Sequence, residues 1–143
     1  MDIAPFKALA NSPVGMTCHL LFEAWDADNP STQSPFVIEE IIRQQIGFDG
    51  LLLTDDLDME ALDGSVPDRA EKSIAAGCDI ALNCWAKMDH MEGIAERLPT
   101  MSDKISERLA RANDVAATQP NHDARGDLIA QRDALLELAG ANA

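Results

Sequence analysis

Residues 47–62, GFDGLLLTDDLDMEAL, carry the clearest structural pattern in this sequence. The three consecutive residues Leu51 to Leu53 show no alternation of apolar and polar side chains. Such a run is typical of a parallel strand that helices cover on both faces, so we predict a strand from Gly50 to Thr54. Because α/β proteins keep their sites at the carboxyl ends of parallel strands, the acidic residues that follow are candidates for chemistry and not only for capping the next helix. These residues are Asp55, Asp56, Asp58 and Glu60.

Strand-like and helix-like segments alternate along the rest of the chain. Two further strands are predicted, at 14–22 and 78–84. A turn or single helical turn is expected at 2–10, and longer helices at 35–46, 65–76, 87–98, 101–118 and 123–139. Local signals mark the helix ends. They are the cap Ser34 before Pro35, the capping-box spacing of Ser65 and Asp68, and the stops Gly47 and Gly77.

The order β-α-β-α-β-α-α-α predicts an α/β protein with right-handed βαβ units and a parallel sheet. Three parallel strands would leave two unpaired edges, which indicates that the sheet is part of something larger. Four of the five longer helices, all except 87–98, also carry an apolar stripe that we expect to face a core. The stripes are Val37, Ile38, Ile41 and Ile42; Ala70, Ile74 and Ala75; Ile105, Leu109, Ala112 and Ala116; and Leu128, Ile129, Leu135 and Leu136.

Composition restricts the class of protein and of partner. The 143 residues, 46% hydrophobic and 25% charged, predict a single globular domain. A net charge of −14 would repel nucleic acid and anionic membrane surfaces, and no apolar run approaches the roughly 20 residues that span a bilayer. The N-terminus does not read as a secretion signal, so we expect a cytoplasmic protein. The three cysteines show no zinc-binding spacing and are expected to be buried, reduced thiols.

The paired aspartates fit the chemistry of a retaining glycosidase. Such an enzyme needs a carboxylate nucleophile and a proton donor about 5 Å away. Asp55 or Asp56 could attack, and strand alternation cannot choose between them because leucine occupies both faces of the strand. His19, near the end of the preceding strand, would lie within reach of the same edge.

Two metal-dependent interpretations of the acidic residues fit the sequence less well than a glycosidase does. Asp56, Asp58 and Glu60 match the first three ligand positions of an EF-hand loop, but Ala61 and Pro67 stand where that loop needs glycine and glutamate. Asp56 and Asp58 also form the Asp-x-Asp pattern of magnesium-dependent phosphatases of the haloacid-dehalogenase type. No later pair of aspartates that could hold the magnesium is visible, and this phosphatase remains an alternative.

Motifs in the right order resemble the family 3 glycoside hydrolases, in particular the cytoplasmic bacterial β-N-acetylglucosaminidases of cell-wall recycling. They cover about residues 2–95. Four positions depart from the family pattern: Cys18, Asp58, Asn83 and Trp85. The matching motifs are DIAPF at 2–6, MTCH at 16–19, SP at 34–35, GFDG at 47–50, TDDLDM at 54–59 and AGCD at 76–79.

The resemblance implies a site and a substrate. In this family the aspartate that follows Ser or Thr at this strand end is the nucleophile, which assigns that role to Asp55. Asp56 takes a supporting role, and His19, Met16 and Met59 are expected to contact the substrate. The implied reaction is release of terminal β-linked N-acetylglucosamine from a saccharide, without a metal or an organic cofactor.

The resemblance also implies that much of the enzyme lies elsewhere. Family members are (β/α)8 TIM barrels, and this chain is similar to a partial barrel, the last three βα units plus C-terminal helices. Residues 1–99 would belong to the barrel domain and 100–143 to the helices. The histidine that serves as acid/base in the family has no counterpart here. We therefore expect either a glycosidase completed by an N-terminal barrel portion, or an inactive fragment that acts only with a partner chain.

Overall fold

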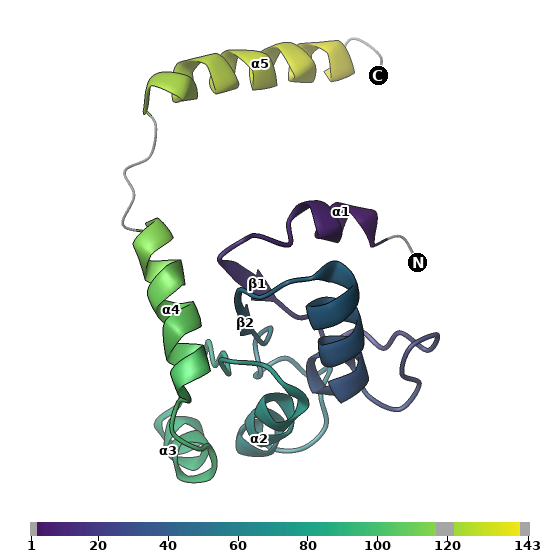
Figure 1. Ribbon diagram of the computed structural model, residues 1–143, viewed down its shortest axis with the longest axis vertical. Helices are drawn as coiled ribbons and strands as arrows, with labels where there is room; N and C mark the ends of the chain where they lie inside the picture. The colour runs from purple at the N-terminus through teal and green to yellow at the C-terminus, as the bar shows by residue number, and fades with distance from the viewer. Residues whose placement is uncertain (1–2, 117–121, 141–143) are drawn as a thin grey trace.

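A computed structural model describes residues 3–116 and 122–140 of the chain (Figure 1). Residues 117 and 118, the predicted end of one helix, and the predicted polar break at 120–121 lie outside this part. The elements are α1 (Ala4–Ala8), β1 (Val14–Met16), η1 (Ser31–Gln33), η2 (Val37–Ile46), β2 (Leu51–Leu53), α2 (Val66–Ala76), α3 (Met88–Arg97), α4 (Asp103–Ala116) and α5 (His122–Gly140).

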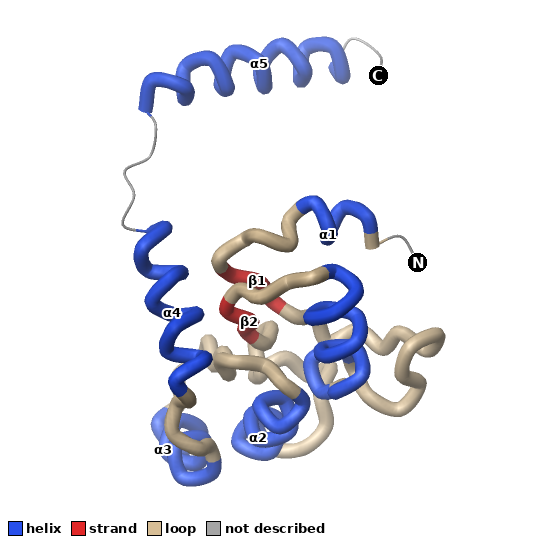
Figure 2. Tube along the Cα trace, in the orientation of Figure 1, coloured by secondary structure: helices blue, strands red, loops and turns tan. Residues whose placement is uncertain are grey.

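The sheet of the described residues is parallel, as predicted, but smaller than expected. β1 and β2 lie side by side, with Val14 opposite Leu51 and Met16 opposite Leu53 (Figure 2). The third predicted strand, 78–84, forms only a single parallel bridge, between Leu53 and Ile80. Residues 3–116 and 122–140 therefore form a mixed α/β fold with two parallel strands and mostly helices.

The predicted strand 78–84 is not regular because side-chain oxygens accept two of the hydrogen bonds that main-chain carbonyl groups would accept in a sheet. The main-chain N–H of Leu52 donates to the carboxylate of Asp79 at 2.9 Å, and the N–H of Leu82 donates to Oγ1 of Thr54 at 2.9 Å. A regular ladder would instead pair these donors with carbonyl groups. The segment that contains Ile80 thus lies along β2, but it is held by side chains at two of its positions.

The first strand is shorter than its predicted span of 14–22. Beyond Met16, the carbonyl groups of Cys18 and Leu20 accept hydrogen bonds from residues 31 and 32 of η1 and not from a neighbouring strand. The Thr32 hydroxyl lies 2.9 Å from the Cys18 carbonyl oxygen, and both the N–H and the hydroxyl of Ser31 donate to the carbonyl of Leu20 at 2.9 Å. Because these carbonyl groups are already satisfied, the segment after β1 becomes a loop.

The local helix signals are confirmed. The Ser34 hydroxyl accepts the N–H of Val37 at 3.1 Å, and Ser65 and Asp68 form a complete capping box. Gly47 and Gly77 end η2 and α2 with left-handed backbone, at φ values of 82° and 116°. The sequence did not indicate that η2 is a π-helix, with wider turns than an α-helix.

Two apolar clusters form the core. One lies between the sheet and the helices η2 and α2, and the other lies where α2 meets α3 and the loop after β2. On α2 the predicted stripe needs a correction, because Ala75 is exposed and Ser73 is buried in its place. The buried residues are Ile38, Phe48, Leu52, Ala76 and Cys78 in the first cluster, and Leu57, Leu62, Val66 and Ala70 in the second.

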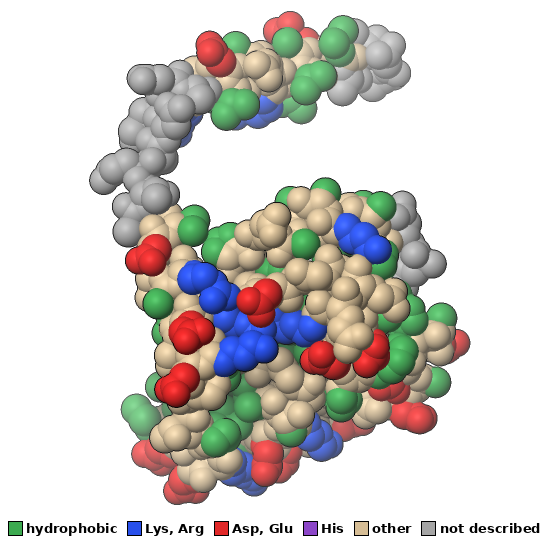
Figure 3. Space-filling model, viewed as in Figure 1, with side chains coloured by type: hydrophobic (Ala, Val, Ile, Leu, Met, Phe, Trp, Pro, Cys, Tyr) green, Lys and Arg blue, Asp and Glu red, His purple; other side chains and the backbone are tan. Residues whose placement is uncertain are grey.

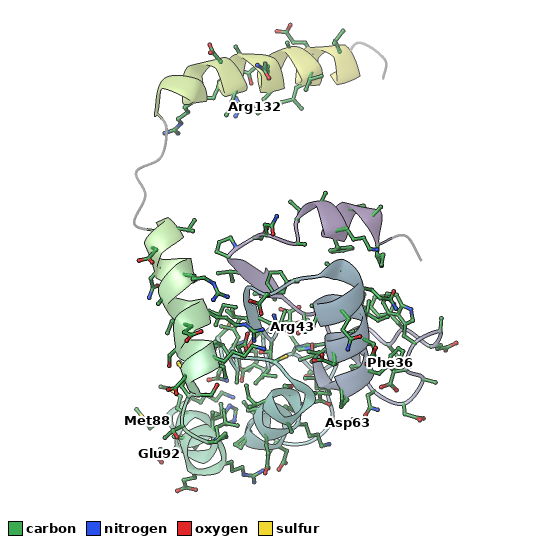
Figure 4. All side chains as sticks on the ribbon, viewed as in Figure 1. Phe36, Arg43, Asp63, Met88, Glu92 and Arg132 are labelled. Atoms are coloured by element: carbon green, nitrogen blue, oxygen red, sulfur yellow. The ribbon has the colours of Figure 1, made fainter. Side chains whose placement is uncertain are left out.

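Charged side chains attach α4 to the amino end of β2. Asp79, almost fully buried, accepts hydrogen bonds from Arg43 of η2 and Arg108 of α4, both at 2.9 Å. Arg108 and Arg111 also pair with Asp49, at 2.6 and 3.3 Å. Figure 3 shows the basic side chains gathered beside α4, and Figure 4 shows Arg43 among them. Asp49 and Asp79, from two motifs of the family resemblance, therefore have structural partners.

The last helix does not build a core. Leu128, Ile129, Leu135 and Leu136 of α5 are exposed, contrary to the prediction that they form a packed face. In Figure 1 this helix runs apart from the rest of the molecule. Across the part of the chain that the structure describes, no helix is both long enough and apolar enough to cross a membrane.

Candidate active site

Thr54 fixes the direction in which the acidic loop leaves the sheet. Its side chain is fully buried directly after β2. Its N–H donates to the carbonyl of Ile80, and its hydroxyl oxygen accepts the N–H of Leu82, both at 2.9 Å. These two bonds hold the carboxyl end of β2 against the neighbouring segment, so that Asp55 begins the loop at a defined point.

Asp55 is the least constrained of the three aspartates that follow. It is half-buried, and its Oδ1 accepts the main-chain N–H of Asp56 at 2.8 Å. Within the described residues no donor forms a hydrogen bond with its second oxygen. That oxygen is consequently available to an incoming group from outside these residues.

Asp56 is tied down on both its side chain and its main chain. Its Oδ1 accepts the N–H of Asp58 and the N–H of Cys84, each at 3.1 Å. Its carbonyl oxygen accepts the N–H of Met59 at 3.2 Å. Partial burial opposes the charge, but the N–H donors of Cys84 and Asp58 outweigh it and lower the pKa of Asp56. Asp56 is therefore an ionised structural anchor.

The carboxylate of Asp58 is almost fully buried. Its Oδ2 accepts the side-chain amide of Asn83 at 2.7 Å and the N–H of Trp85 at 3.0 Å. Nδ1 of His90 lies 3.3 Å from its Oδ1 without making a hydrogen bond. Asp58 thus fastens the acidic loop to residues 83–85 and is not exposed to an outside ligand.

His19 is buried and uses both ring nitrogens inside the protein. Nε2 lies 2.9 Å from the carbonyl oxygen of Asp56, and Nδ1 lies 2.9 Å from the hydroxyl of Thr32. Because a carbonyl oxygen can only accept, Nε2 carries a hydrogen and donates it. His19 therefore supports the main chain next to Asp55, and neither nitrogen is free to serve as a proton donor to a ligand.

The other two predicted site residues are exposed methionines. Met59 lies in the acidic loop and bonds through its N–H to Asp56, which also contacts His19. Met16 lies on β1 opposite Leu53, and it forms no part of this hydrogen-bonded group. The structure thus joins His19, Asp56 and Met59 directly, with Asp55 adjoining, and leaves Met16 one strand away.

Two residues of this region were not predicted. Thr32, fully buried, lies within hydrogen-bonding distance of both His19 and Thr17. Arg69 of α2 donates through Nη1 to the carbonyl groups of Leu57 and Met59, at 2.8 and 2.9 Å. Each contact joins segments that are at least 10 residues apart in the sequence, so no local pattern could have indicated them.

The cysteine beside the carboxylates is not an activated nucleophile. Desolvation, together with the nearby charges of Asp56, Asp58 and Asp55, raises the pKa of the exposed Cys84 thiol. Burial raises the pKa of Cys78 to about 12. Because the thiolate is the reactive form, both side chains are poor nucleophiles at neutral pH. All three cysteines are free, as predicted, but of the three only Cys78 is buried, so the prediction of burial is wrong for Cys18 and Cys84.

The larger of two described cavities does not belong to the acidic loop. It has a volume of about 350 Å³ and lies among α1, β1 and η2, where its lining is almost entirely apolar. None of the acidic residues at 55–60 lines it. Asp55 therefore lies outside this cavity, at the carboxyl end of β2.

Comparison with known proteins identifies the fold. Residues 1–115 match the Glycosyl hydrolase family 3 N terminal domain. The chain belongs to glycoside hydrolase family 3. This match includes every predicted site residue and most of α4, and α5 lies outside it.

Several bacterial members of glycoside hydrolase family 3 are similar in sequence. A beta-hexosaminidase from Chromobacterium violaceum is 36% identical over 114 residues, which are 77% of this chain and 32% of that protein. A beta-hexosaminidase from Vibrio cholerae is 30% identical over 115 residues, or 77% of this chain and 34% of that protein. The chain thus spans about a third of the length of these relatives.

Solved structures of the family agree with the fold. NagZ from Neisseria gonorrhoeae, solved in complex with N-trifluoroacetyl-D-glucosamine, matches with a TM-score of 0.61 and 26% identity over 82% of this chain and 36% of that chain. The beta-N-acetylglucosaminidase from Thermotoga maritima matches with a TM-score of 0.61 and 25% identity, over 82% and 28% of the two chains.

Proposed function

We propose that this chain contributes the nucleophile of a retaining β-N-acetylglucosaminidase, and that Asp55 is that nucleophile. The carboxylate would attack the anomeric carbon of a terminal β-linked N-acetylglucosamine and form a covalent glycosyl-enzyme. The leaving oxygen would take a proton from an acid, and water would then release the sugar and regenerate Asp55. The cytoplasmic recycling of cell-wall muropeptides is the process that such a reaction would serve.

The single observation that carries this proposal is the unequal bonding of the three aspartates. Asp56 and Asp58 accept hydrogen bonds from main-chain donors at residues 58, 84 and 85 and act as anchors. Asp55 accepts a single hydrogen bond, from the N–H of the next residue, and no donor from a distant segment of the described chain holds its carboxylate. A nucleophile must be free to reach the substrate, and the family resemblance independently favours the aspartate that follows Thr54.

We expect the acid that protonates the leaving group to come from outside the described residues. His19 forms a hydrogen bond with the acidic loop, but both of its ring nitrogens already have partners within the protein, so it has no nitrogen left to protonate a leaving group. Loss of a general acid typically reduces a rate by about 10² to 10⁴. We therefore expect the 143-residue chain to need a complementing barrel portion for turnover, and to be inactive alone.

A covalent label tests the assignment of the nucleophile. A mechanism-based fluorosugar should modify Asp55 in the chain mixed with the N-terminal portion of a related enzyme, and peptide mapping by mass spectrometry would locate it. The Asp56→Asn variant should still be labelled, whereas Asp55→Asn should not. A label on Asp56, or on any other residue, would show that the assignment is wrong.

The phosphatase alternative predicts a different dependence on metal. A phosphatase with Asp56 as nucleophile would need magnesium and a second free aspartate, but Asp58 is committed to Asn83 and Trp85. We expect hydrolysis of a chromogenic N-acetylglucosaminide to continue in EDTA. Faster cleavage of p-nitrophenyl phosphate, stopped by EDTA, would favour the phosphatase.

A further inference from the structure

Trp85 is an exposed aromatic residue that is fixed beside the acidic loop. Its N–H donates to Oδ2 of Asp58 at 3.0 Å, and the N–H of Cys84 donates to Oδ1 of Asp56 at 3.1 Å. The main chain at Trp85 is therefore held against the loop that begins with Asp55. The side chain itself is 65% exposed, so the indole ring is open to solvent and is not part of the core.

A lysine ammonium lies over this indole ring. Nζ of Lys87 is 4.8 Å from the ring centroid of Trp85, a distance at which a cation is attracted to the face of an aromatic ring. Lys87 is exposed, and in the part of the chain that the structure describes it pairs with no carboxylate. The two residues thus present an aromatic surface and a positive charge side by side.

The backbone between these two residues is strained. Ala86 has a φ of 48°, in the left-handed region that residues other than glycine seldom adopt. Before it, the N–H of Trp85 is bonded to Asp58. After it, the carbonyl of Lys87 accepts the N–H of Met91 at 3.0 Å in the first turn of α3. Because both flanking residues are fixed, the chain turns at Ala86 alone. Backbone strain of this kind is concentrated at sites that bind ligands.

We propose that Trp85 and Lys87 bind the leaving sugar of the substrate, and that this sugar carries a carboxylate. The ring of the leaving sugar stacks on the indole, and the Lys87 ammonium pairs with the carboxylate. Attack by Asp55 takes place at the carbon to which the leaving sugar is joined, so that sugar lies one ring away from the acidic loop. This inference rests on the proposed function, because it places the leaving sugar beside Asp55.

The chemistry of the two side chains selects an acidic saccharide as the occupant. Sugar rings carry C–H groups on their faces, and an exposed indole offers these groups an apolar surface. With a net charge of −14 the chain repels an acidic sugar unless a cation lies at its carboxylate. Lys87 supplies that cation, whereas a neutral sugar would need only the ring. Trp85 is also one of the positions at which the sequence departs from the family pattern, so the resemblance does not imply this site.

Ligand binding by the 143-residue chain tests this site without reference to turnover. Fluorotryptophan gives one fluorine NMR signal for each of the two tryptophans, Trp25 and Trp85, and the Trp85→Phe variant assigns them. The ligands are N-acetylglucosamine β-1,4-linked to N-acetylmuramic acid, and the methyl ester of this disaccharide, which lacks the negative charge. Both should shift the signal of Trp85 and not that of Trp25. The acid should bind about three- to fivefold more tightly, as expected for one exposed ion pair.

Three variants separate the contributions of the ring and the charge. Lys87→Met should abolish the preference, so that the acid and the ester bind equally. Lys72→Met, on the exposed side of α2, is the matched control and should keep the preference. Trp85→Ala should weaken the binding of both ligands about tenfold, measured by saturation-transfer NMR of the ligand, because the apolar contact is lost. Thermal unfolding should be the same in all three variants, since each of these side chains is exposed.

The outcomes distinguish this proposal from the proposed function. Binding as expected, together with a fluorosugar label on a residue other than Asp55, would support the site and refute the assignment of the nucleophile. A label on Asp55, together with no shift of the Trp85 signal, would do the reverse. Equal affinity of the wild-type protein for the acid and the ester, or an unchanged preference in Lys87→Met, would overturn the proposal whatever the label shows.

Discussion

The ring nitrogen Nε2 of His19 donates to the main-chain carbonyl of Asp56 at a distance of 2.9 Å. The bond joins the segment after β1 to the loop after β2, 37 residues along the chain. On its other side His19 contacts the buried hydroxyl of Thr32. A histidine that the sequence suggested as a ligand of the substrate therefore supports the peptide group that follows Asp56.

The first prediction concerns this support. His19→Leu should lower the free energy of unfolding by about 1–3 kcal/mol, because it removes the hydrogen bonds that His19 makes with the Asp56 carbonyl and with the Thr32 hydroxyl. Urea unfolding followed by circular dichroism would measure the change. His90→Leu is the matched control, since Nδ1 of His90 makes no hydrogen bond. An equal loss in both variants would show that the bond to Asp56 adds nothing.

The second prediction concerns the buried carboxylate that holds α4. Asp79→Asn should destabilise the protein by about 3–5 kcal/mol, because Arg43 and Arg108 would keep buried charges with no full counter-charge. Asp49→Asn should cost at most about 1 kcal/mol, since that carboxylate is mostly exposed. Chemical unfolding of both variants provides the comparison. The explanation fails if Asp49→Asn is the more damaging substitution.

A third prediction follows from the loop between β1 and η2. Hydrogen bonds from the hydroxyl of Ser34, and then from the N–H groups of Asp28 and Asn29, lower the pKa of Asp26 from 3.8 to about 2. Because the pKa is lower in the folded state than in the unfolded state, the ionised carboxylate stabilises the protein at pH values above the ordinary pKa. This stabilisation is lost as the pH falls through the pKa of the folded state.

Melting temperatures would test this third prediction. Between about pH 4 and about pH 2, the wild-type protein should lose stability more steeply than Asp26→Asn, which cannot titrate at this position. Asp28→Asn is the control, because the Asp28 side chain accepts no hydrogen bond among the described residues. Identical pH profiles for the wild type and Asp26→Asn would contradict the prediction.

The fourth prediction concerns the thiols. In the native protein, iodoacetamide should modify the exposed Cys84 and leave the buried Cys78 unmodified, as peptide mapping would show. Because neighbouring carboxylates raise the pKa of Cys84, Asp56→Asn should increase its rate of alkylation at pH 8. Glu71→Gln, on the exposed side of α2, should leave the rate unchanged. Rapid modification of native Cys78 would contradict the assigned burial.

Helix boundaries were predictable because their causes are local. The Ser34 cap and the Ser65–Asp68 capping box each act within three residues, and glycine at 47 and 77 permits the left-handed backbone that ends a helix. Strand lengths were not predictable in the same way. They depend on which partner satisfies each main-chain group, and here Asp79 and Thr54 take positions that a neighbouring strand would hold.

The sequence by itself determined the family, the parallel β2 and the place of the acidic residues at its carboxyl end, because residue type and order carry those patterns. Only the tertiary structure distinguished the roles of the aspartates. Asp56 and Asp58 are held by main-chain donors from residues 84 and 85, and Asp55 is not. The physical reason is that a hydrogen bond depends on distance and direction in space. Segments 27 and 28 residues apart meet at this loop only after the chain has folded.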